Sequence, residues 1–151
     1  MQPIKVTKAD IDADLSVIWN KFVFTIAPAK PSELTTIQFA AALAFSYHAE
    51  IMNGGHYQYF ENRGTEEIDA VILSLRVIGA EAFAEIATRA KARAAEHPPK
   101  HPETVDEFVA GALEGAFDDL DRAFYRTKPE ITDVLEAYIK EHEAEFIERV
   151  P

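Results

Sequence analysis

Two polar side chains, His48 and Glu50, interrupt the most apolar stretch of the sequence. Glu50 falls on the same helical face as Tyr47, so we expect its carboxylate to be partly buried. A buried carboxylate needs hydrogen-bonding partners or a raised pKa, and carboxylates with shifted pKa values gather at functional sites. The structural alternative, which we favour, is that Glu50 accepts hydrogen bonds from backbone N–H groups around Gly54 and Gly55.

Most other reactive chemistry is missing from the sequence. There is no cysteine, which excludes disulfides, thiol nucleophiles and cysteine-ligated metal sites. A glycine-rich phosphate loop, an HExxH zinc motif and a serine-nucleophile elbow are also absent. His97 and His101 lie four residues apart, but in a proline-rich connector and not on one helix face, and His142 falls on an apolar face. We therefore predict no metal and no cofactor, and the balance favours a protein that is not an enzyme.

Carboxylates dominate the last third of the chain. The formal net charge is −11, from 26 acidic and 15 basic residues. Residues 1–102 carry 12 acidic and 10 basic residues, a net of −2, whereas residues 103–151 carry 14 and 5, a net of −9. This charge repels phosphates, which argues against direct binding to nucleic acid or to an anionic membrane, and it attracts basic proteins. The alternative is that acidic helices only keep the protein soluble.

One predicted helix, from Thr104 to about Arg126, concentrates this charge. At about 100° per residue, four of its carboxylates fall within about 60° of one another, opposite an apolar stripe. No lysine or arginine lies between Glu103 and Asp121, although like charges four residues apart destabilise a helix slightly. The last predicted helix adds further carboxylates. The predicted partner-binding face consists of Glu107, Glu114, Asp118, Asp121, Glu136 and Glu143.

Helical periodicity runs along the whole chain, and no strand pattern outweighs it. The sequence therefore predicts an all-α, single-domain bundle of about six or seven helices over residues 1–151. The proline-rich connector 97–102 is the only candidate hinge, but neither side of it would form a convincing core alone. No run of about 18 apolar residues could span a membrane, and no secretory signal is evident, so we expect a cytoplasmic protein. The expected helices span about 9–26, 32–52, 56–62, 65–78, 80–96, 104–126 and 129–146.

The most distinctive segment is EIMNGGHYQYFENRG, from Glu50 to Gly64. It resembles the E-x-x-N-G-G-F-x-Q-Y-F-x-N-x-x-G signature of a family of small bacterial helical domains that is named after a DNA-mimic protein. The resemblance covers about residues 37–147. This chain departs from the signature at His56, where phenylalanine is usual, and at Arg63, where a small residue is usual. The positions that form a structural motif, or that could line a pocket, are Glu50, Asn53, Gly54, Gly55, Gln58, Tyr59, Phe60, Asn62 and Gly64.

The resemblance implies a function as well as a fold. The family's named member is understood as an acidic dimer that occupies the DNA-binding face of a helix-turn-helix regulator, with carboxylates in place of phosphates. The signature itself is not acidic, and we interpret it as architecture: glycines for a sharp reversal, aromatic rings for packing, and Gln58 and Asn62 as hydrogen-bonding partners. The same residues could instead line a small-ligand pocket, because such pockets combine aromatic walls with a few polar groups.

Three functional hypotheses follow. The leading one is a non-enzymatic acidic binding protein, in its most specific form a DNA mimic that occupies the DNA-binding face of a basic transcription regulator. The second is a ligand-binding or enzymatic module centred on Glu50–Phe60. The third is that the acidic face confers only solubility and the protein acts otherwise, for instance as an immunity-type protein that neutralises a toxin. A homodimer is expected from the resemblance.

Overall fold

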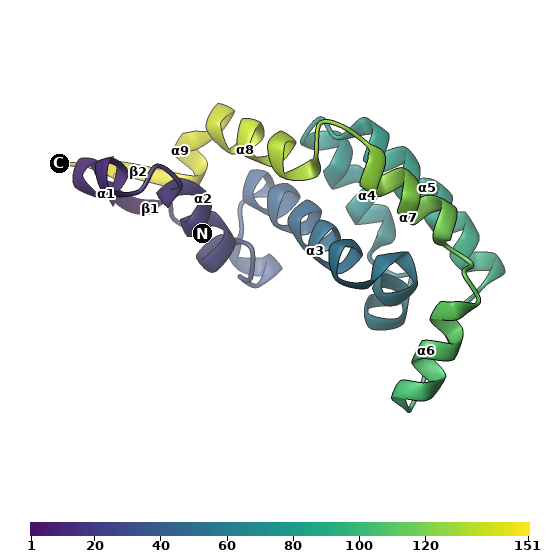
Figure 1. The fold of residues 1–151 in the computed structure, drawn as a ribbon. Helices are drawn as coiled ribbons and strands as arrows, with labels where there is room; N and C mark the ends of the chain where they lie inside the picture. Colours follow the sequence, from purple (N-terminus) through teal and green to yellow (C-terminus); the bar gives the residue numbers. More distant parts are fainter.

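The computed structural model describes all 151 residues, which form nine α-helices and one small sheet (Figure 1). The all-α prediction is confirmed, whereas the two-stranded parallel sheet was not expected from the sequence. In chain order the elements are β1 (Ile4–Thr7), α1 (Lys8–Ala13), α2 (Val17–Lys21), a π-helical turn (Phe22–Ile26), a 3-10 turn (Pro31–Glu33), α3 (Thr36–Arg63), α4 (Ile68–Val77), α5 (Glu81–Glu96), α6 (Val105–Leu113), α7 (Asp118–Arg126), α8 (Ile131–Glu141), α9 (Glu143–Phe146) and β2 (Ile147–Val150).

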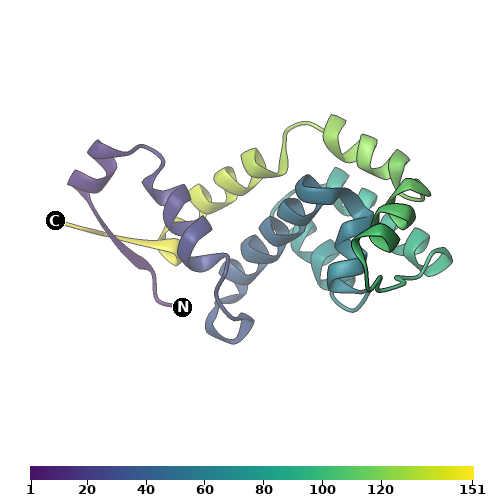
Figure 2. The same ribbon diagram turned by 60° about the horizontal axis from the view of Figure 1, so that its bottom comes forward.

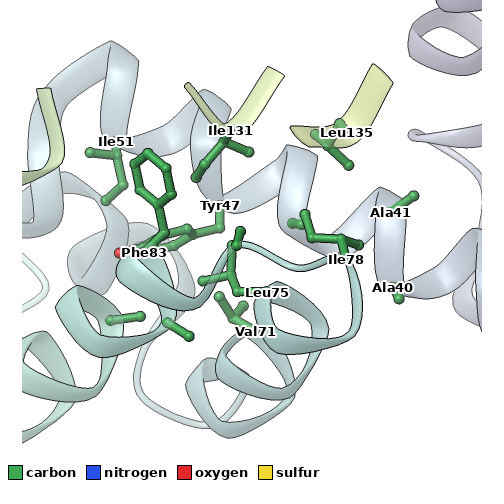
Figure 3. Close-up of a cluster of buried hydrophobic side chains, with 14 of the residues drawn as sticks. Ala40, Ala41, Tyr47, Ile51, Val71, Leu75, Ile78, Phe83, Ile131 and Leu135 are labelled. Carbon is green, nitrogen blue, oxygen red and sulfur yellow. The ribbon is translucent and has the colours of Figure 1, made fainter. Parts of the chain in front are cut away.

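The long helix α3 lies at the centre of the molecule. It contacts α4, α7, α8 and α9, because its first half is apolar on nearly all sides. Figure 3 shows side chains from several elements meeting there, among them Tyr47 of α3, Leu75 of α4, Phe83 of α5 and Ile131 of α8. Thirty-one buried residues form one continuous hydrophobic core around these contacts. No helix is both long enough and apolar enough to cross a membrane.

The two strands join the two ends of the chain at one end of the molecule (Figure 2). Ile4 pairs with Ile147 at the start of the parallel register. Beside the sheet, the fully buried Gln38 donates from Nε2 to the backbone oxygens of Met1, at 3.1 Å, and Glu145, at 2.5 Å. Its Oε1 also accepts a hydrogen bond from the N–H of Thr35, the N-cap of α3. One amide therefore connects both chain ends to the central helix.

Three helix predictions in the first half of the chain were wrong in their limits. The helix expected over 9–26 breaks after α1, because the Asp14 carboxylate accepts hydrogen bonds from the Ser16 N–H and the Asn20 amide, and Leu15 points into solvent. The helix expected over 32–52 begins at Thr36, capped by Thr35, and runs through a kink to Arg63. The helix expected over 65–78 starts later than predicted, because α4 begins at Ile68.

The long acidic helix expected over 104–126 is also two helices. Thr104 caps α6 as predicted, since its hydroxyl accepts the Glu107 N–H. The helix then ends at Leu113, because Gly115 adopts a φ of +69° and the chain turns to bury Phe117. The predicted apolar stripe is therefore interrupted: α6 has no buried residue, and the carboxylates before and after Gly115 do not share one helix face.

Gln38→Ala should destabilise the protein by about 2–3 kcal/mol. The substitution leaves the part-buried carbonyl oxygens of Met1 and Glu145 and the Thr35 N–H without their side-chain partner, and it removes one of the two hydrogen bonds of the capping box of α3. Urea unfolding followed by circular dichroism measures the difference. Gln2→Ala, at an exposed position near the same end of the molecule, is the control and should change the unfolding free energy by less than about 0.5 kcal/mol. Equal losses in the two variants would contradict this role of Gln38.

Candidate functional site

The signature segment forms the kink of α3. Gly54 and Gly55 have non-helical backbone angles, and the φ of Gly55 is +72°. A Cβ atom at Gly54 would overlap the Gln58 side chain, and a Cβ atom at Gly55 would overlap the Asp121 carboxylate. Both glycines are thus required because other side chains occupy the space next to them. The predicted sharp reversal is present, as a bend that joins two helical halves.

Glu50 fastens the two halves of α3 to each other. It lies before the kink, and its carboxylate accepts hydrogen bonds from three side chains after the kink: Gln58 at 3.3 Å, Asn62 at 3.1 Å and Arg63 Nε at 3.1 Å. Arg63 also donates to the Ser46 hydroxyl at 3.2 Å. The partners we expected for Glu50, backbone N–H groups at the glycines, are wrong, because the glycines let the chain fold back and bring longer side chains within reach.

This hydrogen bonding shifts the acidity of Glu50. Partial burial by itself raises the pKa of the carboxyl, but the hydrogen bonds from Asn62, Gln58 and Arg63, with the positive charge of Arg63, outweigh that effect. The pKa of Glu50 therefore lies below its ordinary value. Glu50 is an ionised structural group at neutral pH, and it does not hold a proton for general acid chemistry.

His56, the position where the chain departs from the signature, is completely buried. Its Nδ1 donates to Asp121 Oδ1 at 2.5 Å, and its backbone N–H donates to the same oxygen at 2.9 Å. Its Nε2 is hydrogen-bonded to the Tyr47 hydroxyl, with 2.7 Å between the two atoms. The imidazole stacks on Phe117, with ring centroids 6.2 Å apart. This Tyr47–His56–Asp121 network connects both halves of α3 to α7.

The network has the order of a nucleophile, a base and an orienting carboxylate, but not the properties of a catalytic relay. Tyr47 and His56 have no exposed surface, so no substrate atom can approach either group. Burial, with smaller effects from Tyr59 and Asp121, raises the pKa of Tyr47 well above its ordinary value. A nucleophile is activated by the opposite shift or by proton transfer to an accessible site. The network therefore acts as a structural clamp.

The remaining signature residues divide between packing and surface. Tyr59 and Phe60 are both about 2% exposed and pack edge to face. Burial raises the pKa of Tyr59, whose hydroxyl has no hydrogen-bond partner in the protein. Gly64 ends α3 with a φ of +67°, and Asn53 is exposed on the outer side of the kink.

Tyr57 extends from the kinked half of α3 toward α6. Its ring lies 5.1 Å from that of Phe108, measured between centroids, and its hydroxyl occupies the position that a Cβ at Gly111 would need. The connector 97–102 is held to the same region, because the Glu61 carboxylate accepts the backbone N–H groups of Lys100 and His101. The connector is thus a fastened turn beside α6.

Four of the six carboxylates predicted to face a partner are engaged within the protein. Asp121 holds His56, and its side chain is 22% exposed, so its placement on an open acidic strip was wrong. Glu107 accepts the N–H groups of Glu103 and Thr104 at the start of α6. Each of the other two forms a salt bridge: Glu114 with Lys100 at 3.0 Å, and Glu143 with Arg149 at 2.6 Å.

The other two, Asp118 and Glu136, are exposed and form no hydrogen bond or salt bridge within the chain. Asp106, on α6, is a further free carboxylate that the sequence reasoning did not select. The sequence carried a signal for Asp106. It lies in the first turn of a capped helix, and no Lys or Arg lies within four residues of it. These three side chains belong to three successive helices, α6, α7 and α8, which follow one another along one edge of the molecule (Figure 1).

Phe60 is the one predicted pocket residue that lines either of two cavities of the protein. A cavity of about 290 Å³ opens between α2, α8 and β2, where Trp19, Ile139 and Arg149 line it. A second, of about 250 Å³, lies between Tyr57, Phe117 and the connector. Neither is lined by Glu50, Asn53, Gln58 or Tyr59, and no group of three or more His, Asp or Glu side chains is placed to hold a metal ion.

Comparison with known proteins identifies one match. Residues 32–142 match the family model described as DMP19-like protein. This match spans α3 to α8 and includes the kink, the Glu50 cluster and the Tyr47–His56–Asp121 network. No curated protein and no solved structure is similar enough to the chain to count as a match.

Asp121→Ala should lower the unfolding free energy by about 2–3 kcal/mol. The substitution removes the acceptor of two buried donors, the His56 Nδ1–H and backbone N–H. Thermal and urea unfolding measure the loss. Asp118→Ala, three residues earlier on the exposed face of α7, is the matched control and should cost less than about 1 kcal/mol. If the two variants are equally stable, Asp121 is not the clamp that we describe.

Glu50→Gln should lower the stability at pH 7 by about 1–2 kcal/mol and flatten the acid limb of the stability curve. Because the pKa of Glu50 is lower in the folded state, its contribution is present above the unfolded pKa and is lost as the pH falls through the folded pKa. The variant and the parent protein should therefore differ less and less as the pH falls from the ordinary glutamate pKa of about 4.3 through the lower pKa of folded Glu50. Urea unfolding between pH 3 and pH 8 tests this, with the exposed Glu85→Gln as control; a pH-independent difference would contradict it.

Proposed function

The chain belongs to the DMP19-like protein family, and on that premise we propose that it is a non-enzymatic binding protein whose acidic C-terminal part contacts a basic protein. In the most specific form of the proposal, the protein is a DNA mimic that occupies the DNA-binding face of a regulator such as a helix-turn-helix protein. The observation that carries the proposal is the net charge of −9 on residues 103–151, together with the family match.

The placement of this charge supports an interaction surface and not a flexible acidic tail. Residues 105–141 contain α6, α7 and α8, and α7 and α8 are anchored in the core by Leu120, Phe124 and Leu135. Carboxylates on such helices keep fixed separations, which is what recognition of a set of Lys and Arg side chains requires. Fixed charges also cost less side-chain and backbone entropy on binding than disordered ones do.

Several carboxylates of this region are held by helix caps or salt bridges, and they surround others that are free. Asp106, Asp118 and Glu136 have no partner within the chain and are fully available to another molecule. Salt bridges at the surface, such as Lys100–Glu114, are weak enough for a competing cation to replace them. A basic partner can thus bind both the free carboxylates and those that now form surface salt bridges.

The second hypothesis, a ligand or catalytic site at Glu50–Phe60, has less support. Both oxygens of Glu50 are occupied by side chains of the same segment, and Tyr59 and Phe60 are packed in the core. Tyr57 and Phe60 of the segment line the cavity beside the connector, but Glu50, Asn53, Gln58 and Tyr59 line neither this cavity nor the one between α2, α8 and β2.

Replacing the free carboxylates tests the proposed function. We expect the parent protein, immobilised and exposed to lysate of its source organism, to retain a basic DNA-binding protein at 50 mM salt and to release it at 500 mM salt, because exposed charges are screened. The triple variant Asp106→Asn, Asp118→Asn, Glu136→Gln should bind the recovered partner at least about tenfold more weakly, and duplex DNA should compete with the parent protein.

The control carries the same change in net charge elsewhere. Glu66→Gln, Glu85→Gln and Glu96→Gln remove three exposed carboxylates before residue 103 and should leave the affinity within about twofold. Equal weakening in both triple variants would show that only total charge matters and would contradict a defined acidic surface. Recovery of a toxin that duplex DNA does not displace would replace DNA mimicry with the immunity-type role.

A further inference from the structure

Helix α6 exposes the apolar side chains that the sequence pattern assigned to the core. Val105 is 77% exposed, Val109 47% and Leu113 81%. The fourth residue of this face is Ala112, which is also exposed. At about 100° per residue these four side chains lie within an arc of about 100°, the width of a helix face that normally packs against a neighbour. In Figure 1, α6 projects from the body of the molecule.

The side of α6 that carries Phe108 and Gly111 is fixed to the protein. Phe108 packs on the ring of Tyr57, and Gly111 lies directly against the Tyr57 hydroxyl, so these two residues turn toward the body. Lys100 of the connector holds Glu114 just after the helix. The exposed apolar face is therefore presented in a defined direction, and α6 cannot simply rotate to bury it without losing the Tyr57 contacts.

Charge decides between the candidate occupants of this face. Asp106 borders the apolar arc, and from Glu103 to Asp121 the chain contains seven acidic residues and no basic one. A second copy packed on α6 would bring two such segments together, and like charges at an interface oppose association. A segment with an apolar stripe flanked by Lys or Arg would match both the apolar arc and its acidic border.

We propose that the exposed face of α6 is the apolar anchor for a basic amphipathic helix of the partner, which the surrounding carboxylates orient. The inference rests on the proposed function, since the partner is the same basic protein. The apolar contact supplies a contribution that salt does not screen, whereas the carboxylates supply attraction that salt weakens. Binding at α6 should thus persist in part at high salt.

Two synthetic helical peptides test the anchor with the full chain. The first carries leucines at i, i+3, i+4 and i+7 with lysine and arginine on the flanks, and the second has the same composition in scrambled order. We expect the striped peptide to bind at least about tenfold more tightly than the scrambled one by fluorescence anisotropy in 300 mM salt. Val109→Gln with Leu113→Gln should abolish that preference.

The chain offers a matched control for this variant. Leu73 and Val77 on α4 are also a leucine and a valine four residues apart, and they are 63% and 51% exposed. The charged residues beside them are already paired with α5, Asp69 with Lys91 and Arg76 with Glu81. Leu73→Gln with Val77→Gln should leave the preference for the striped peptide unchanged. Equal effects of the two double variants would overturn the assignment of the anchor to α6.

The remaining outcomes separate the anchor from the proposed function. If both peptides bind equally and both lose affinity in the Asp106→Asn, Asp118→Asn, Glu136→Gln variant, the acidic surface stands and the apolar anchor fails. If neither peptide binds, the anchor fails irrespective of what the lysate experiment recovers. Sedimentation decides the last case: a dimer of the parent protein that the Val109→Gln, Leu113→Gln variant dissociates would show that a second copy covers α6, and would overturn the proposal.

Discussion

The kink of α3 is the constraint on which the rest of the structure depends. At Gly55 the helix bends with a positive φ, and the carboxylate of Asp121 occupies the space where any other residue would carry a Cβ. This contact places α7 against the kink, which buries His56 between Tyr47 and Phe117. The same bend brings Gln58, Asn62 and Arg63 back to Glu50. It also directs Tyr57 outward, where it supports α6.

The acidic residues of the last third of the chain serve two physical purposes. Some are structural: Asp121 holds a buried histidine, and Glu107 caps a helix. Others, such as Asp106 and Glu136, have no partner in the chain. Net charge alone does not separate the two groups, because a carboxylate that accepts buried N–H groups still counts as −1. The surface available to a basic protein is therefore smaller and more defined than the formal charge of the segment indicates.

Burial distinguishes a structural network from a catalytic one here. Tyr47, His56 and Asp121 link a hydroxyl, an imidazole and a carboxylate in the order of a catalytic relay, and Glu50 lies in the same kinked helix. Tyr47 and His56 are fully buried and hydrogen-bonded within the protein, and burial moves the pKa of Tyr47 away from reactivity. Buried hydrogen-bonded networks of this kind make one packing arrangement specific, because any alternative would leave a buried donor unpaired.

The sequence by itself determined the all-α class, the cap at Thr104, the reversal at Gly54-Gly55 and the concentration of charge after residue 102, because these follow from local periodicity, capping chemistry and composition. Glu50 accepts hydrogen bonds within its own segment, as expected, but the donors are side chains and not the backbone N–H groups that we predicted. Only the tertiary structure decided that Gly115 breaks the acidic helix, that Asp121 turns inward and that the apolar face of α6 stays exposed. A helical pattern shows which residues share a face, but whether that face meets a core, a carboxylate or solvent depends on segments far away in the sequence, here the bend of α3 about 60 residues earlier.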